Sequence, residues 1–85
     1  MQIHFLNHAL RRMSERNLSQ ALVKKVIERP DKVEHSIKDS QRFLFKKKYL
    51  HNSSQERLLI VITEKNDNVL IVVTVIDTSK VQKHW

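Results

Sequence analysis

The first third of the chain carries apolar residues at the spacing of two short amphipathic helices, over residues 8–17 and 20–29. Their apolar sides are formed by Ala9, Leu10 and Met13 in the first helix and by Leu22, Val23, Val26 and Ile27 in the second. Asn7 and Ser19 stand where N-caps are expected, and Pro30 ends the second helix because the residue before a proline disfavours the helical conformation. Residues 1–6 alternate weakly, which indicates a short strand or an extended lead-in.

The rest of the chain has the pattern of β-strands. Ten of the sixteen Val and Ile residues lie between Ile60 and Val81, and branched aliphatic residues favour strands. We predict strands over residues 32–38, 41–49, 57–64 and 69–78. Because the chain has no glycine, the turns must use other polar residues, and we expect them at Asp39-Ser40, Asn52-Ser53-Ser54 and Asn66-Asp67.

A two-residue loop at Asn66-Asp67 predicts the register of the last hairpin. It pairs Ile62 with Ile71, Ile60 with Val73 and Leu58 with Val75, and we assign these six residues to the face that the helices cover. The opposite, mixed face then holds Leu59, Val61, Thr63, Leu70, Val72 and Thr74. It is too apolar to face water, so the C-terminal tail, a second copy or another protein is expected to cover it. The predicted fold is α+β: one domain, residues 1–85, with two N-terminal helices on one face of an antiparallel sheet of about four strands.

Composition excludes several classes of site. The 85 residues include no Cys and no Gly, which rules out disulfides, thiolate zinc sites, a Cys nucleophile and glycine-rich phosphate loops. We expect no cofactor and no metal, since the histidines lack ligand spacing unless His4 and His8 share a helix. No apolar run is long enough to span a membrane and the N-terminal residues do not have the charged-then-apolar pattern of a secretory signal, so we expect a cytoplasmic protein.

The net charge of +7 is unevenly distributed. Residues 1–30 carry +4, residues 31–55 carry +3, and residues 56–85 are neutral. This asymmetry favours a polyanionic partner, either nucleic acid or an acidic protein, over a basic surface that only aids solubility. The side chains expected to contact phosphates are Arg11, Arg16, Arg42, Lys46, Lys48 and Lys83.

Two groups of residues have the chemistry of metal-independent RNA cleavage. His8, Arg12 and Glu15 share a polar helical face, where a histidine can move protons and an arginine can stabilise phosphate charge. Thr78, Ser79 and Lys80 follow the last strand and can orient a phosphate from the end of the sheet. The alternatives are a solvated helix face and a tail in which Trp85 folds back to close the core.

The central lysines are open to two interpretations. Arg42, Lys46 and Lys48 alternate along one strand and can follow a phosphate backbone, but lysines also protect edge strands from aggregation. The aromatic residues of the same segment, Phe43, Phe45 and Tyr49, can either stack on bases or pack in the core.

The run His8-Ala9-Leu10-Arg11-Arg12-Met13-Ser14-Glu15-Arg16 resembles the opening signature of a small bacterial family known as domain of unknown function 4258. The resemblance continues in Arg29-Pro30-Asp31, in residues 74–80 and in Lys83-His84-Trp85. Asn17 stands where the family tends to have glycine, and Ile76 and His84 stand where tyrosines are expected. The order of elements is similar to that of RelE/ParE and barnase-like ribonuclease toxins, which implies an antitoxin peptide covering an exposed surface.

These observations lead to three hypotheses of different classes. The first is a toxin-like, metal-independent endoribonuclease or related RNA-directed protein, with His8 as acid or base and Arg12 holding the phosphate. The second is a non-catalytic basic module that binds nucleic acid or an acidic protein. The third is a homodimeric structural protein that associates through Leu59, Val61 and Val72 of the mixed sheet face.

Overall fold

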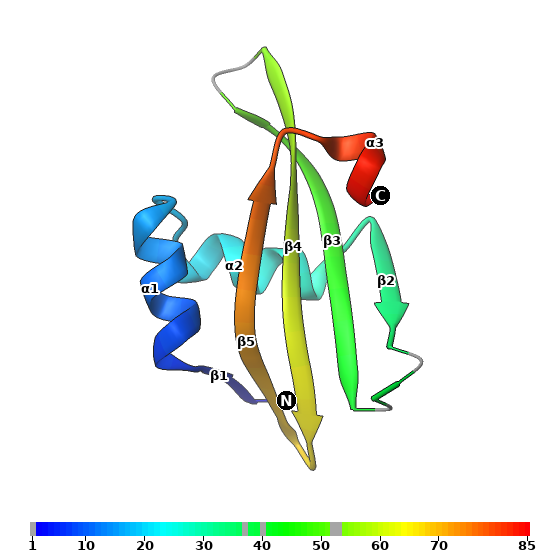
Figure 1. Cartoon of the computed structure of the whole chain (residues 1–85). Coiled ribbons are helices and arrows are strands. Elements are labelled where there is room, and N and C mark those ends of the chain that lie inside the picture. Colours follow the sequence, from blue (N-terminus) through cyan, green and yellow to red (C-terminus); the bar gives the residue numbers. More distant parts are fainter. Residues whose placement is uncertain (1, 37, 40, 52–53) are drawn as a thin grey trace.

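The computed structural model describes residues 2–36, 38–39, 41–51 and 54–85, and it has an α+β fold. The elements follow in the order β1 (Gln2–Phe5), α1 (Asn7–Glu15), α2 (Gln20–Glu28), β2 (Lys32–His35), β3 (Arg42–His51), β4 (Gln55–Asn66), β5 (Val69–Thr78) and α3 (Val81–His84). The strands form one sheet in the order β1-β5-β4-β3-β2 (Figure 1). The helices α1 and α2 pack on one face, and the short α3 lies on the other (Figure 1).

The sheet differs from the expected antiparallel sheet of four strands because β1 joins it. Gln2 pairs with Val69 and Phe5 with Val72, so β1 runs parallel to β5 at the edge of the sheet. All other pairs of strands are antiparallel, which makes the five-stranded sheet mixed. The weak alternation of residues 1–6 indicated extended backbone but contained no information about its partner.

Of the two predicted N-caps, one is confirmed by the structure and the other is not. The Ser19 hydroxyl accepts a hydrogen bond from the Leu22 amide at 3.0 Å, which confirms the predicted cap of α2. Asn7 is the first residue of α1 and not its cap, because Leu6 occupies that position without a side-chain cap. After α1 the chain turns through Asn17, whose φ of 56° lies in the left-handed region that favours glycine or asparagine.

The hairpin between β4 and β5 has a different register from the predicted one. Its turn is centred on Asp67, with a φ of 54°, and Asn66 pairs with Val69. A bulge between Ile62 and Thr63 then shifts the pairing further. The observed pairs are Leu58 with Thr78, Ile60 with Ile76 and Ile62 with Thr74. The predicted turns at Asp39-Ser40 and Asn52-Ser53-Ser54 include positions outside the described residues.

The assignment of the two sheet faces was therefore wrong for most of the hairpin, although Val75 packs in the helix-side core as predicted. Leu59, Val61 and Val72 pack with residues of α1 and α2 in the helix-side core. Leu58 and Ile60 lie on the opposite face in a second cluster. Because Leu59 and Val61 are fully buried under the helices, they are not available as the contacts of a homodimer or as the surface that an antitoxin covers.

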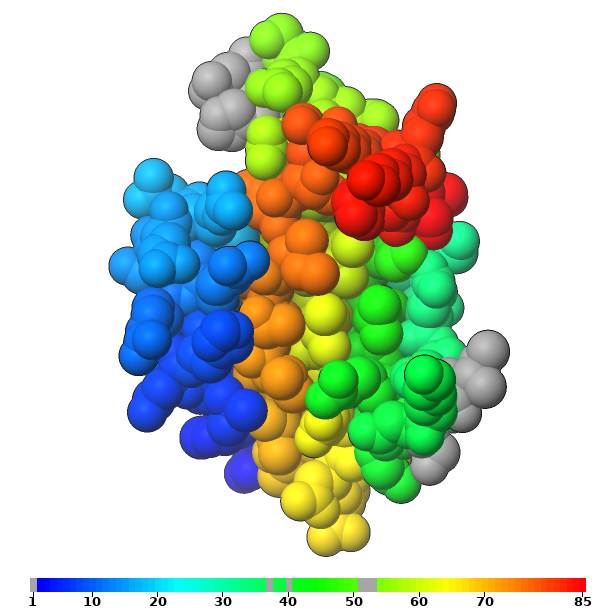
Figure 2. Space-filling view, viewed as in Figure 1, coloured from blue at the N-terminus to red at the C-terminus, as the bar shows by residue number. Residues whose placement is uncertain are grey.

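The C-terminal segment covers part of the face opposite the helices. Val81 of α3 is buried with Leu58 and Ile60, and Trp85 packs against the same cluster. This confirms the alternative in which Trp85 folds back on the core. The side chains of β3, β4 and β5 stay visible between α1 and α3 (Figure 2). No helix in the described part of the chain is long and apolar enough to span a membrane.

Candidate nucleic-acid interface

Five of the seven lysines and arginines on the strands are held in ion pairs, and the other two are Lys48 and Lys65. Arg57 Nε lies 3.0 Å from Asp77 Oδ1, and Lys47 Nζ lies 3.7 Å from Asp31 Oδ1. Further pairs join Arg42 to Glu64, Lys46 to Glu34 and Lys32 to Glu34. Much of the positive charge on the strands is therefore neutralised within the molecule.

The cations of the helices are not paired in this way. We call residues 7–29, which include α1 and α2, the helical layer. Its six lysines and arginines are Arg11, Arg12, Arg16, Lys24, Lys25 and Arg29. In the described structure none of them forms an ion pair. All except Arg12 are exposed. The only acids of this layer are Glu15 and Glu28, so it presents a net charge of +4.

His8 and Arg12 lie one helical turn apart on α1. Residues at this spacing lie on the same face of a helix, which brings the imidazole and guanidinium within reach of one bound group. His8 is exposed, whereas Arg12 is half-buried. The Nε atom of Arg12 is buried and has no hydrogen-bond partner among the described residues. An anion beside Arg12 would be held by charge-assisted hydrogen bonds.

The structure does not bring His8 together with Thr78, Ser79 and Lys80. The Leu6 amide donates to the Val72 carbonyl, which places the start of α1 beside Val72 (Figure 1). Thr78 lies six residues further along β5, a distance of about 20 Å at the rise of an extended strand. The Thr78 hydroxyl accepts a hydrogen bond from the Lys80 amide at 3.1 Å, so it supports the local turn.

The predicted phosphate contacts on β3 have partners within the protein. Arg42 pairs with Glu64, and Lys48 Nζ lies 4.4 Å from the centre of the Trp85 ring. Lys46 is only 5% exposed, so it is not presented to a phosphate in this conformation. Lys83 is exposed on α3. The edge-strand interpretation was also wrong, because β3 lies between β4 and β2.

The aromatic residues of β3 serve packing. Phe45 and Tyr49 pack against the helix-side core, and Phe43 stacks on His35 with ring centres 4.6 Å apart. These contacts confirm the core-packing alternative for Phe45 and Tyr49, whereas Phe43 packs on a histidine and belongs to neither core cluster.

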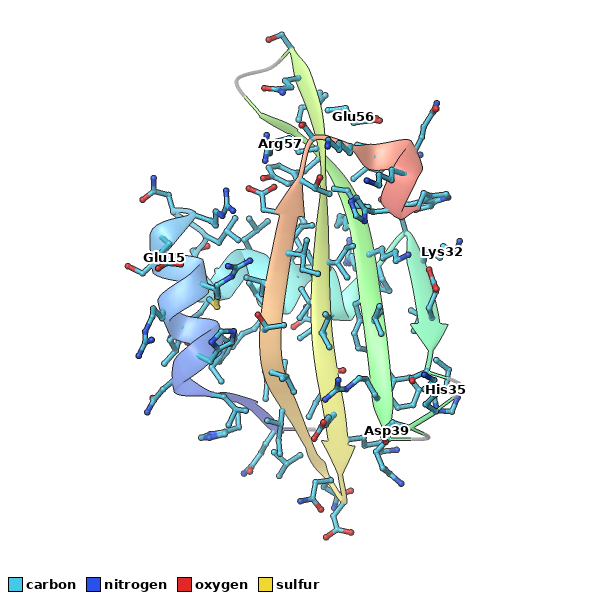
Figure 3. All side chains as sticks on the ribbon, viewed as in Figure 1. Glu15, Lys32, His35, Asp39, Glu56 and Arg57 are labelled. Carbon is cyan, nitrogen blue, oxygen red and sulfur yellow. The ribbon has the colours of Figure 1, made fainter. Side chains whose placement is uncertain are left out.

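Sequence reasoning missed a polar cluster at the end of the sheet near Arg57 (Figure 3). The Asp77 carboxylate accepts hydrogen bonds from the Tyr49 hydroxyl at 2.7 Å and from Arg57 Nε at 3.0 Å. Burial, followed by the hydrogen bond to Asp77, raises the pKa of Tyr49 above its usual range. The three residues come from β3, β4 and β5, so only the correct register could have identified them.

Two hollows have linings that include neither His8 nor Arg12. A hollow of about 380 Å³ is lined mainly by polar residues, including Asp39, Glu64 and Asp67. A second hollow, of about 330 Å³, is lined by Ile27, Phe43, Phe45, Lys65 and Leu70. Within the described segments, no group of three metal-ligating side chains is placed to hold a metal ion.

A comparison with family models identifies the chain. Residues 5–77 match the model described as domain of unknown function (DUF4258). The chain belongs to the DUF4258 family. The DUF4258 segment contains both helices of the helical layer and ends at Asp77, so α3 and Trp85 follow it. No match was found among curated proteins or among solved structures. The analogy to RelE/ParE and barnase-like toxins therefore rests on the order of elements alone.

Proposed function

We propose that this DUF4258 protein is an RNA-directed protein that holds the phosphate backbone with the exposed cations of its helical layer. The observation that carries the proposal is the segregation of charge. Five of the seven lysines and arginines on the strands are paired with acids, Lys48 and Lys65 being the exceptions, whereas all six of the helical layer lack an acid partner in the described structure. Unpaired cations need no internal ion pair to be broken before they contact phosphates.

Phosphate contacts of this kind supply affinity without sequence information. Each neutralised phosphate releases counterions, so the affinity falls as salt is added. The two helices are nine residues each, which suits a short stretch of backbone.

The test compares two variants, one that loses three positive charges from the helical layer and one that loses three from outside it. The helical variant combines Arg11→Ala, Lys24→Ala and Lys25→Ala. The matched control combines Lys38→Ala, Lys65→Ala and Lys83→Ala, which are exposed cations outside the helical layer. Fluorescence anisotropy with a labelled RNA oligonucleotide should show about tenfold or greater weakening for the helical variant only. Its log–log salt slope should fall by about 2 in magnitude. Equal losses in both variants would contradict the proposal, because net charge alone would then explain binding.

A second candidate function is metal-independent cleavage of the bound RNA at His8 and Arg12. It is favoured by the buried Nε of Arg12, which lacks a partner among the described residues, one turn from an exposed histidine. In this reaction His8 accepts the proton of a ribose 2′-hydroxyl, whose oxygen attacks the adjacent phosphorus. The bond from phosphorus to the 5′ oxygen breaks, and that oxygen takes a proton from solvent. Arg12 stabilises the charge that develops on the phosphate.

Cleavage is tested with labelled RNA in excess chelator. Wild type should cleave RNA and spare DNA, which lacks the 2′-hydroxyl. His8→Ala should lose activity by about a hundredfold or more, whereas His4→Ala, an exposed histidine on β1, should keep it. Circular dichroism confirms that each variant is folded. Full activity of His8→Ala would remove His8 from the mechanism. An inactive wild type would reject cleavage and leave the binding proposal standing.

A further inference from the structure

Three lysines converge on one point of the sheet face opposite the helices. Lys32 pairs across the strands with Lys46, and Lys48 is two residues further along β3 on the same face. Lys46 Nζ donates hydrogen bonds to the main-chain oxygens of His84 and Trp85 at 2.7 and 3.0 Å. Lys32 Nζ also donates to the Trp85 oxygen, at 2.9 Å, and lies on β2 next to α3 (Figure 3).

The ring of Trp85 is held by the same lysines. The ammonium groups of Lys48 and Lys32 lie 4.4 and 5.4 Å from the ring centre. Both distances fall within the range of cation–π attraction. The C-terminal residues thus show which groups the three lysines can bind together, namely oxygen acceptors beside a planar aromatic ring.

Positive side chains predominate at this point. The three lysines contribute +3 and Glu34, which pairs with Lys46 and Lys32, contributes −1, so these four side chains sum to +2. A phosphate monoester carries up to two negative charges and can accept charge-assisted hydrogen bonds from the lysines.

We propose that Lys32, Lys46 and Lys48 form a binding site for a nucleoside phosphate, and that residues 80–85 occupy this site in the present conformation. The phosphate takes the place of the two main-chain oxygens, and the base takes the place of the Trp85 ring. The site is separate from the helical layer and does not depend on the function proposed for that layer.

The tail is suited to leave the site. Helix α3 has only four residues, and its buried side chain is Val81. Such a short segment with few buried contacts opens at low free-energy cost. When it opens, Leu58 and Ile60 beneath it offer an apolar surface for the base. The family match ends at Asp77, so the sheet that carries the lysines belongs to the family segment and the covering tail follows it.

The test uses the full chain and adenosine 5′-monophosphate, with binding followed by NMR chemical shifts. Trp85→Ala removes the group that competes with the base. If the closed tail occupies the site in nine molecules out of ten or more, this variant should bind about tenfold tighter than wild type. Adding Lys48→Ala to it should remove the gain, whereas adding Lys83→Ala, which changes the same charge on α3, should not.

Two further probes separate the parts of the ligand. Ribose 5-phosphate should bind more weakly than the nucleotide, and adenosine should bind more weakly still. The gain should persist when the helical variant described above is combined with Trp85→Ala. In the wild type, saturating nucleotide should increase quenching of the single tryptophan by iodide, because the tail is displaced. No gain in Trp85→Ala, an equal gain for adenosine, or unchanged quenching would overturn the proposal.

Discussion

At the scale of single residues, buried polar groups join strands that are distant in the sequence. Asp77 is the centre of one such group, with a side chain only 9% exposed. It is held by Tyr49 and Arg57, which lie 28 and 20 residues away along the chain. Both hydrogen bonds are accepted by Oδ1, so this buried oxygen is satisfied by groups of the protein. Removal of either partner would leave Asp77 with fewer hydrogen bonds inside the protein.

Because Tyr49 is the only tyrosine of the chain, its titration can be measured without overlap from another phenol. Burial and the hydrogen bond to Asp77 raise the pKa of Tyr49, so its phenol should ionise above pH 10 in an ultraviolet titration. A raised pKa means that the folded state binds the proton more tightly. The resulting stabilisation is complete below about pH 10 and is lost as the pH rises through the folded pKa. Asp77→Asn should move the titration back toward pH 10, and an unchanged curve in that variant would exclude the carboxylate as a cause.

At the scale of elements, features that depend on neighbouring residues could be predicted, whereas features that depend on pairing between strands could not. Ser19 was identified as a cap because its role depends only on the next three residues. The strand over residues 69–78 was located correctly because its branched residues are continuous. The register of β4 against β5 depends on a bulge between Ile62 and Thr63, which no local signal in a run of similar apolar residues reveals. Since both faces of this hairpin carry apolar residues, alternation of polar and apolar residues was absent as a guide.

The contribution of the Ser19 cap to the free energy of unfolding can be measured. Ser19→Ala removes the acceptor for the Leu22 amide and should lower the free energy of unfolding by about 1 kcal/mol in urea titrations. Ser14→Ala is the matched control, because Ser14 is exposed within α1 and alanine is the better helix former. That control should be neutral or slightly stabilising. Equal effects of the two substitutions would show that the hydroxyl of Ser19 contributes nothing specific.

At the scale of the whole molecule, one face of the sheet packs against helices from the start of the chain and the other is partly covered by its end. The total charge and its excess in the first two thirds could be read from the sequence, but the pairing of those charges could not. Lys46 illustrates the difference: its alternation with Arg42 and Lys48 indicated an exposed phosphate contact. The structure instead buries it under a tail 38 residues away, because that tail supplies oxygen acceptors for its ammonium group. The helical layer is basic because it has six lysines and arginines and only two acids, Glu15 and Glu28, and none of these cations is paired among the described residues.

The contacts that join the edge strand β2 to residues 84–85 through Lys46 should weaken at low pH. The hydrogen bond from Lys46 is the largest cause that lowers the pKa of Glu34. A lowered carboxyl pKa stabilises the fold above the unfolded value of about 4.3, and this contribution is lost as the pH falls through the folded pKa. Protonation of Glu34 leaves Lys46 with only the tail oxygens as acceptors, so thermal stability should decrease below about pH 4. Trp85 fluorescence should change over the same range, because Lys32 and Lys46 contact both Glu34 and the tail. Glu34→Gln cannot ionise and should show a smaller change in both signals. A variant with the same acid transition as wild type would assign the loss of stability to other carboxylates.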